Sequence, residues 1–174
     1  IHSLHCMTPQ LQLQHDVATI TLSRPDMANR LAQEDLSTLV EHVATINRNP
    51  NIRVLILQSE GKYFCSGYDI AAIQGGVYGG ATDLALACDF RVGSTHSNMF
   101  MPAAKLGLHF YAQGLERYVT RLGLNTAKRL FLTGERLDAP AMKECGFLTH
   151  LIAPEQLQHT VTELSDSLRA MAPL

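Results

Sequence analysis

The sequence predicts an α/β fold, because two apolar periods alternate along its first sixty residues. Apolar and polar residues alternate over 11–21 on either side of His15-Asp16, which is typical of two strands joined by a tight turn. Over 36–46 the apolar residues recur every three or four positions, the period of one helix face. The apolar run 54–57 predicts a strand buried on both faces. A strand, a helix and a strand in this order favour parallel pairing.

Prolines, glycines and capping residues mark where the predicted strands and helices begin and end. We expect the second half of the chain to be mainly helical. Pro25 ends the second strand and Pro50 ends the first helix, because proline restricts its own backbone and that of the preceding residue. Asn125 is placed to cap a helix that runs to Thr133, and Gly134 is its stop signal.

The last third of the chain continues in the same manner. Asp138 is placed to cap another helix, which ends before Gly146. Residues 148–152 predict a strand, after which Pro154 opens a final helix through Leu168. The sequence contains no repeat and no low-complexity tract.

The composition is that of one globular domain. The chain has 174 residues, of which 46% are hydrophobic and 17% charged. A chain of this length and composition can bury a hydrophobic core that needs no disulfide or metal to stabilise it. Fourteen basic against sixteen acidic side chains give a net charge of −2, which does not favour binding to nucleic acid. The longest apolar runs have four or five residues, whereas a membrane-spanning helix needs about twenty, so we expect no membrane span.

The spacing of the cysteines and the composition of residues 1–10 indicate the cellular location of the protein. The four cysteines are far apart and form no C-x-x-C pair, which argues against a zinc ribbon and favours buried free thiols in a reducing compartment. Residues 1–10 have no apolar stretch of the kind found in secretory signals. We therefore expect a cytoplasmic protein.

Two glycine-rich segments carry the strongest chemical signals, and they are Gly61-Lys62-Tyr63-Phe64-Cys65-Ser66-Gly67-Tyr68-Asp69-Ile70 and Gly75-Gly76-Val77-Tyr78-Gly79-Gly80-Ala81-Thr82-Asp83. The second runs into an apolar helix over 84–88. Glycines at a helix start let a ligand approach the free backbone N–H groups at the positive end of the helix dipole. Two such turns facing each other would form an oxyanion hole for a thioester carbonyl that becomes an enolate. Tight turns chosen only for backbone geometry are the alternative interpretation.

The junction between the two segments is too short for the expected topology. Ile73 ends an apparent helix turn, and Gln74 begins the next glycine-rich turn with no strand between them. A return to a parallel neighbour takes about a dozen residues or more. Either the fold is unusual here, or a segment is absent between Ile73 and Gln74.

Four motifs occur in an order that resembles the enoyl-CoA hydratase/isomerase (crotonase) superfamily, and they are Arg24-Pro25-Asp26-Met27-Ala28-Asn29, Phe64-Cys65-Ser66-Gly67-Tyr68-Asp69-Ile70, Gly79-Gly80-Ala81-Thr82-Asp83-Leu84-Ala85-Leu86-Ala87-Cys88-Asp89 and Lys105-Leu106-Gly107-Leu108. The resemblance runs from about Leu11 to Leu174. It implies that 1–174 is a single crotonase-like domain, a spiral of β-β-α units with a helical C-terminal region. A homotrimer, or a hexamer built as a dimer of trimers, is implied as well.

The resemblance also accounts for the short junction. Its members have a helix and a strand, on the order of thirty residues, between the two glycine motifs, as a parallel crossover requires. We therefore expect this segment to be missing between Ile73 and Gln74. We also expect C-terminal helices to be absent after Leu174.

By position, the resemblance assigns an oxyanion hole and one carboxylate. The backbone N–H groups of Tyr68 and Gly80 would form the hole, and Asp83 falls where hydratases carry their first catalytic glutamate. Asp83 is one methylene shorter, and a carboxylate stabilised by the helix dipole is an equally good interpretation. The channel for CoA and the thioester would be lined by Met27, Ala28, Ser66, Tyr68, Asp69, Ile70, Ala71, Gly79 and Gly80.

The second catalytic glutamate of hydratases is replaced by Ala103, which can neither donate nor accept a proton. Hydration with two carboxylates is therefore incomplete. Tyr111 lies near the position where some isomerases carry a second acid, so it is a candidate proton donor, although a buried tyrosine with a satisfied hydroxyl is favoured. His109 beside it is interpreted as structural.

A basic residue that follows the Arg-Pro motif in the family is Met27 here, so Arg30 or Lys62 is a candidate for the CoA phosphates. A solvated surface charge is the slightly favoured alternative for each.

The leading functional hypothesis is an acyl-CoA enzyme that stabilises a thioester enolate and needs no cofactor beyond the CoA of its substrate. Isomerase, hydrolase or decarboxylase chemistry is as plausible as hydration. A non-catalytic acyl-CoA-binding or scaffold homologue is the second hypothesis, and Ala103 favours it. RNA binding, known in one branch of the superfamily, is not favoured by a net charge of −2.

Overall fold

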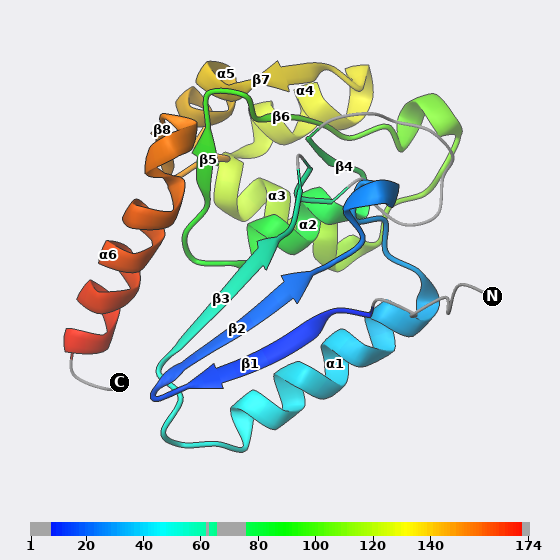
Figure 1. The fold of residues 1–174 in the computed structure, drawn as a ribbon. Helices are drawn as coiled ribbons and strands as arrows, with labels where there is room; N and C mark the ends of the chain where they lie inside the picture. Colours follow the sequence, from blue (N-terminus) through cyan, green and yellow to red (C-terminus); the bar gives the residue numbers. More distant parts are fainter. Residues whose placement is uncertain (1–7, 62, 66–75, 172–174) are drawn as a thin grey trace.

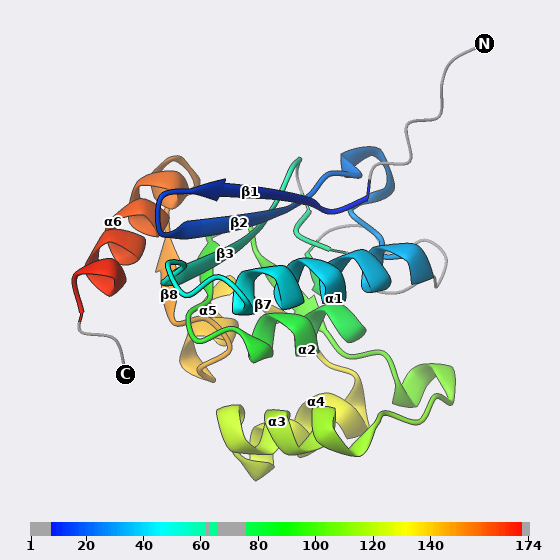
Figure 2. The ribbon, with the colours of Figure 1, turned by 90° about the horizontal axis from the view of Figure 1, so that it is seen from below.

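A computed structural model of the chain describes residues 8–61, 63–65 and 76–171. A three-stranded sheet occupies one side of the molecule (Figure 1), and helices pack in layers away from it. Figure 2 shows helix α1 (Gln33–Asn47) along one face of this sheet. The pair α3 (Ala112–Leu122) and α4 (Leu124–Thr133) lies farthest from the sheet, with α2 (Gly80–Ala87) between. The glycine-rich turn predicted to bind the thioester leads into α2, so this central helix organises the site.

The first sheet confirms the predicted strand–helix–strand unit. Strands β1 (Gln10–Gln14) and β2 (Val17–Leu22) pair antiparallel around His15, whose φ is +55°. Helix α1 (Gln33–Asn47) follows, and β3 (Val54–Ser59) returns parallel to β2. Leu39 and Ile46 of α1 pack against Ala18, Ile20 and Leu57 of the sheet.

Two details of this unit differ from the sequence prediction. The expectation that 54–57 is buried on both faces is wrong, because Leu55 is 44% exposed. The described part of the chain gives β3 one neighbour, β2, so β3 is an edge strand of this sheet. Helix α1 also begins three residues before 36, because Asp35 Oδ2 accepts a hydrogen bond from Ala32 N at 2.6 Å and so satisfies a free donor of the first turn.

Short strands join the remaining elements into two small sheets. Strand β6 (Asn98–Phe100) lies between β4 (Val77–Tyr78), to which it is parallel, and β7 (Arg136–Asp138), to which it is antiparallel. Strand β5 (Val92–Ser94) pairs in parallel with β8 (His150–Ile152), the shortened form of the strand predicted over 148–152. Strands of two or three residues are too short to show a period of two in the sequence.

The helices of the second half follow the predicted pattern, with one correction. Asp138 caps α5, since its Oδ1 accepts a hydrogen bond from Ala141 N at 3.0 Å. Gly134 ends α4 with φ +57°. The expectation that Asn125 caps that helix is wrong, because α4 begins at Leu124 and Gly123, with φ +81°, occupies the cap position. The helices are α2 (Gly80–Ala87), α3 (Ala112–Leu122), α4 (Leu124–Thr133), α5 (Ala139–Glu144) and α6 (Leu157–Ala170), with short 3₁₀ turns at Pro25–Met27, Ala104–Leu106 and Pro154–Gln156.

Helix α2 belongs to two hydrophobic clusters. Its residues Ala85 and Leu86 join the largest cluster, which α3, α4, α5, β6 and β7 complete. Its residue Ala81 joins a smaller cluster with Leu22 of β2 and Cys65. Because apolar side chains hold it from two sides, α2 is fixed in position relative to both halves of the fold.

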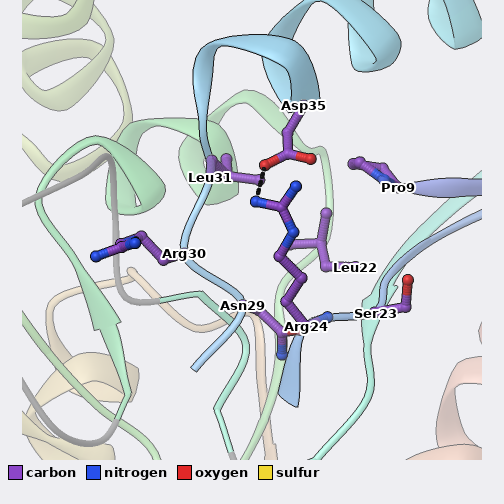
Figure 3. A pocket seen from close by; sticks show the side chains of 8 residues that line it. All are labelled: Pro9, Leu22, Ser23, Arg24, Asn29, Arg30, Leu31 and Asp35. Carbon is purple, nitrogen blue, oxygen red and sulfur yellow. Dashed lines mark hydrogen bonds and ion pairs between the residues drawn. The ribbon is translucent and has the colours of Figure 1, made fainter. Parts of the chain in front are cut away.

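Asn29 connects the loop before α1 to the loop after β3. Its side chain accepts a hydrogen bond from Arg24 N at 2.8 Å and donates to Glu60 O at 2.7 Å and Tyr63 O at 2.6 Å. Arg24 in turn forms an ion pair with Asp35 at 2.8 Å (Figure 3). These bonds hold the end of β3 against the start of α1.

We predict that Asn29→Ala lowers the free energy of unfolding by about 2 kcal/mol, because three backbone groups each lose one hydrogen bond in a site where Asn29 is 1% exposed. Tyr63 O keeps the hydrogen bond that Ser59 Oγ donates to it at 3.1 Å. Urea denaturation followed by circular dichroism measures this change. Asn51→Ala, an exposed position in the turn before β3, is the matched control and is expected to change stability by less than about 0.5 kcal/mol. Equal effects of the two substitutions would contradict the role given to Asn29.

Candidate functional site

The turn before α2 leaves the first backbone N–H groups of that helix available to a ligand. Gly79 has φ +55° and ψ −129°, and its N–H donates to Phe100 O at 3.2 Å. Gly80 is the first helical residue, so its N–H has no acceptor within the helix. A Cβ added to Gly80 would meet no heavy atom of the described residues within 4 Å. The described residues thus leave space beside Gly80 at the positive end of the helix dipole, and no described hydrogen bond uses its N–H.

Hydrogen bonds of neighbouring side chains stabilise the Gly79-Gly80 turn. Thr82 Oγ1 donates to Gly79 O at 2.5 Å and is also hydrogen-bonded to the buried hydroxyl of Tyr118. The hydroxyl of Tyr78 donates to Asn98 Oδ1 at 2.6 Å. The Arg136 guanidinium lies 5.2 Å from the Tyr78 ring centroid and donates to the Tyr78 hydroxyl at 3.0 Å. The geometry of the glycine turn is thus set before a ligand arrives, which is what an oxyanion hole requires.

Asp83 lies on the same side of α2 as Gly80, one helical turn along. Residues three apart on a helix are neighbours, so Asp83 lies beside Gly80 on the surface of α2. The side chain is 6% exposed. Arg117 Nη1 donates to both carboxylate oxygens at 2.6 Å, and the Tyr111 hydroxyl donates to Oδ2.

The contacts among these three residues set their charges. Partial burial and the hydrogen bond to Asp83 raise the pKa of Tyr111 to about 12, so this phenol keeps its proton at neutral pH. The hydrogen bond to Asp83 raises the pKa of Arg117. The three residues therefore form a neutral group, with one cation, one carboxylate and a phenol that is 53% exposed.

Gly114 allows the Tyr111 ring to lie over the first turn of α3. A Cβ added to Gly114 would lie 2.3 Å from Phe110 Cε1 and 2.8 Å from Tyr111 Cε2. The Phe110 and Tyr111 rings stack with their centroids 4.5 Å apart. A larger residue at this position would push the phenol away from Asp83.

The structure brings three of the predicted catalytic residues together, namely Gly80, Asp83 and Tyr111. The expectation that Tyr111 is buried is wrong, because it is half-exposed, whereas the expectation that its hydroxyl has a partner is confirmed by the hydrogen bond to Asp83. Sequence reasoning missed Arg117. One signal that could have found it is the need of a buried aspartate for a cationic partner from another element.

The predicted binding residues are placed less completely. Met27 is 49% exposed and Ala28 has φ +51°, both in the turn that follows Arg24. Six predicted residues lie outside the described part of the chain, namely Lys62, Ser66, Tyr68, Asp69, Ile70 and Ala71. The adjacent described residue, Cys65, forms a parallel β-bridge with Val77 and packs against Ala81 in the first turn of α2.

Ala103, His109 and Arg30 are also described by the structure. Ala103 is buried at the start of the 3₁₀ turn Ala104–Leu106, and it follows Pro102, whose Cδ lies 4.0 Å from where a Gly79 Cβ would be. His109 is exposed. The Arg30 side chain points away from the Arg24–Asp35 ion pair (Figure 3).

The described part of the chain also bears on metal, disulfide and membrane features. No group of three or more His, Cys, Asp or Glu side chains among residues 8–61, 63–65 and 76–171 is arranged to hold a metal ion. None of the three described cysteines forms a disulfide. No described helix is both long and apolar enough to cross a membrane.

The start of α2, the buried Asp83 carboxylate and the Tyr111 phenol together form the candidate site. The sequence profile described as "Enoyl-CoA hydratase/isomerase" matches residues 12–71 and 70–174, and the chain belongs to this family. The enoyl-CoA isomerase/hydratase fer4 of Mycosarcoma maydis is 30% identical, over 89% of this chain and 72% of that protein. The (E)-benzylidenesuccinyl-CoA hydratase of Thauera aromatica is 27% identical, over 97% of this chain and 78% of its own length.

Solved structures confirm the predicted fold. An enoyl-CoA hydratase from Mycobacterium tuberculosis H37Rv superposes with a TM-score of 0.84 and 26% identity, over 94% of this chain and 80% of that chain. The crotonase-like α/β architecture predicted from the four motifs is therefore correct.

We predict that Tyr111 loses its proton near pH 12 and that Asp83→Asn moves this titration toward pH 10, because the substitution removes the charged acceptor. NMR of the tyrosine Cζ carbons across pH 9–13, with Tyr111→Phe for assignment, measures the change. The pKa of Tyr111 is higher in the folded protein than in the unfolded chain. Its contribution to the free energy of unfolding is therefore complete below pH 10 and is lost as the pH rises through 12. A Tyr111 titration unchanged by Asp83→Asn would contradict the contact.

Proposed function

We propose that this protein is an enzyme that binds acyl-CoA thioesters and stabilises a thioester enolate through backbone N–H groups. Gly80 N–H would supply one donor of the oxyanion hole and Tyr68 N–H the other, with no cofactor beyond the CoA of the substrate. The observation that carries this proposal is the open first turn of α2, with Asp83 held one turn further on. Membership of the enoyl-CoA hydratase/isomerase family supports it.

The reaction would take place at the carbon next to the thioester carbonyl. An enolate at that position needs a donor for its oxygen and a group that exchanges a proton with its carbon. Asp83 and Tyr111 are the described groups suited to the second task. Two relatives are named for acyl-CoA substrates, a benzylidenesuccinyl-CoA hydratase and an enoyl-CoA isomerase/hydratase, which supports thioester chemistry here.

A non-catalytic acyl-CoA-binding homologue is the second candidate. Ala103 favours it, because the described residues place no second carboxylate in the site. The burial of the Asp83 carboxylate and its hydrogen bonds from Arg117 and Tyr111 also favour it. This candidate predicts thioester binding without turnover, so binding and chemistry are tested separately.

We further propose that a segment is missing between Ile73 and Gln74. The family profile matches in two stretches that meet at residues 70–71, and the alignment with the T. aromatica hydratase runs over 201 positions although the chain has 174 residues. Both facts support an internal deletion relative to these proteins.

We also propose that the protein forms a homotrimer or a hexamer, which family membership supports. We propose a cytoplasmic location as well, which the widely spaced cysteines support.

We predict that the protein binds acetyl-CoA and crotonyl-CoA at least about tenfold more tightly than free CoA, a difference of about 1.4 kcal/mol. The thioester oxygen supplies the acceptor that Gly80 N–H lacks, and free CoA does not. Isothermal calorimetry with the three ligands measures the preference. Equal affinities for all three would count against an assembled oxyanion hole.

We predict that hydration of crotonyl-CoA is slow or absent and that Ala103→Glu raises its rate by about 10²-fold, the lower range for a positioned acid or base. Loss of absorbance of the enoyl thioester follows the reaction. Ala104→Glu, on the exposed neighbouring residue, is the control and is expected to leave the rate unchanged. A fast wild-type hydration would show that another residue replaces the missing glutamate.

A further inference from the structure

We infer that a small cavity between the end of β2 and the start of α1 binds one water molecule, which donates a hydrogen bond to Asp35 Oδ1. The cavity has a volume of about 10 Å³, and Pro9, Ser23, Arg24 and Asp35 are among the residues that line it (Figure 3). A polar cavity of this size has room for about one water molecule. The inference does not depend on the proposed function, because the cavity shares no residue with the candidate site at α2.

The two oxygens of the Asp35 carboxylate have different surroundings. Oδ2 accepts a hydrogen bond from Ala32 N at 2.6 Å and another from Arg24 Nη1 at 2.8 Å. Oδ1 is buried and forms no hydrogen bond with any described residue. The whole side chain is only 2% exposed, so bulk solvent does not replace the missing donor. A buried carboxylate oxygen without a donor is costly, and a bound water molecule removes that cost.

The free oxygen of Asp35 faces the cavity. Figure 3 shows one carboxylate oxygen turned to the Arg24 guanidinium, where the dashed line marks their contact, and the other turned away from it toward Pro9. Pro9 and Asp35 both line the cavity, so Oδ1 points into it. A donor bound in the cavity therefore meets this oxygen.

Ser23 supplies a second polar partner. An internal water molecule needs two to four such partners. Ser23 lines the cavity and is 3% exposed, and its hydroxyl donates to Thr8 O across a long distance of 3.5 Å. A hydroxyl oxygen that donates in this way keeps its lone pairs for accepting. We assign one proton of the bound water to Asp35 Oδ1 and the other to Ser23 Oγ.

The charges around the cavity favour a neutral donor over a cation. The ion pair with Arg24 at 2.8 Å already balances the Asp35 carboxylate, and Arg24 also pairs with the exposed Glu34 at 3.0 Å. A cation beside Oδ1 would be repelled by this guanidinium. Hard metal ions such as Ca²⁺ also need six or more oxygen ligands, whereas water needs only the two partners described above.

The bound water extends an existing hydrogen-bond network. Asp35 and Arg24 connect the first turn of α1 to the residues that follow β2. A water molecule between Asp35 and Ser23 adds a second connection between the same two segments. We therefore expect this water to exchange slowly with the solvent, as part of the folded structure.

A high-resolution crystal structure of the wild-type protein tests the site directly. We expect one oxygen peak about 2.5–3.0 Å from Asp35 Oδ1, the usual length of an O–H···O hydrogen bond. In solution, deuterium relaxation dispersion of D₂O counts the water molecules that stay bound for longer than the protein tumbles. Asp35→Leu removes the acceptor and fills the cavity with an apolar side chain, so we expect it to lose one such molecule.

Two further variants make the test specific. Glu34→Gln is the matched control, because Glu34 also pairs with Arg24 but is exposed and does not line the cavity. We expect it to keep the wild-type number of bound waters. Ser23→Ala removes only the second partner, so we expect the water to exchange about fivefold faster, the effect of one hydrogen bond. This variant also tests the site if Asp35→Leu does not fold.

Three results would overturn the inference. The first is an equal number of long-lived waters in the wild type and Asp35→Leu. The second is a protein donor bonded to Asp35 Oδ1 in the crystal structure. The third is anomalous scattering beside Oδ1 in crystals soaked with thallium(I), which would identify a cation site. An exchange rate unchanged by Ser23→Ala would contradict the assignment of Ser23 as the second partner.

Discussion

The buried carboxylate of Asp83 is the constraint on which the arrangement of the site depends. A charge taken out of water is stable only when opposite charge and hydrogen-bond donors replace the solvent. Arg117 and Tyr111 supply these donors, and both belong to the segment that forms α3 and its first turn. The position of α3 against α2 is therefore a condition for burying Asp83, and Gly114 is needed so that Tyr111 can reach it.

The scaffold around this group fixes α2 from several directions. Apolar residues of α2 join two hydrophobic clusters, and the turn at its N-terminus is held by Thr82, Tyr78 and their partners. Asn29 secures the loop that follows β3, the strand after which the chain returns toward α2. A glycine turn held in this way can present backbone N–H groups without rearrangement, which makes such donors effective toward developing negative charge.

The described part of the site holds one buried carboxylate, that of Asp83. Arg117 and Tyr111 both donate hydrogen bonds to it, and the side chain of Ala103 carries no acid–base group. Membership of the enoyl-CoA hydratase/isomerase family thus defines the class of substrate more closely than it defines the reaction.

The sequence by itself determined the elements whose signals are local. The β1–α1–β3 order, the cap at Asp138 and the helix stop at Gly134 follow from apolar period and capping chemistry within a few residues. The glycine turn and Asp83 were predicted because ordered motifs carry them. Only the tertiary structure decided the rest. The exposure of Leu55, the true start of α4 after Gly123 and the short strands β4 to β7 depend on neighbours that no local pattern specifies. The pairing of Asp83 with Arg117, 34 residues later in the chain, depends on how α3 packs against α2, because a carboxylate shows its partner only when folding removes it from water.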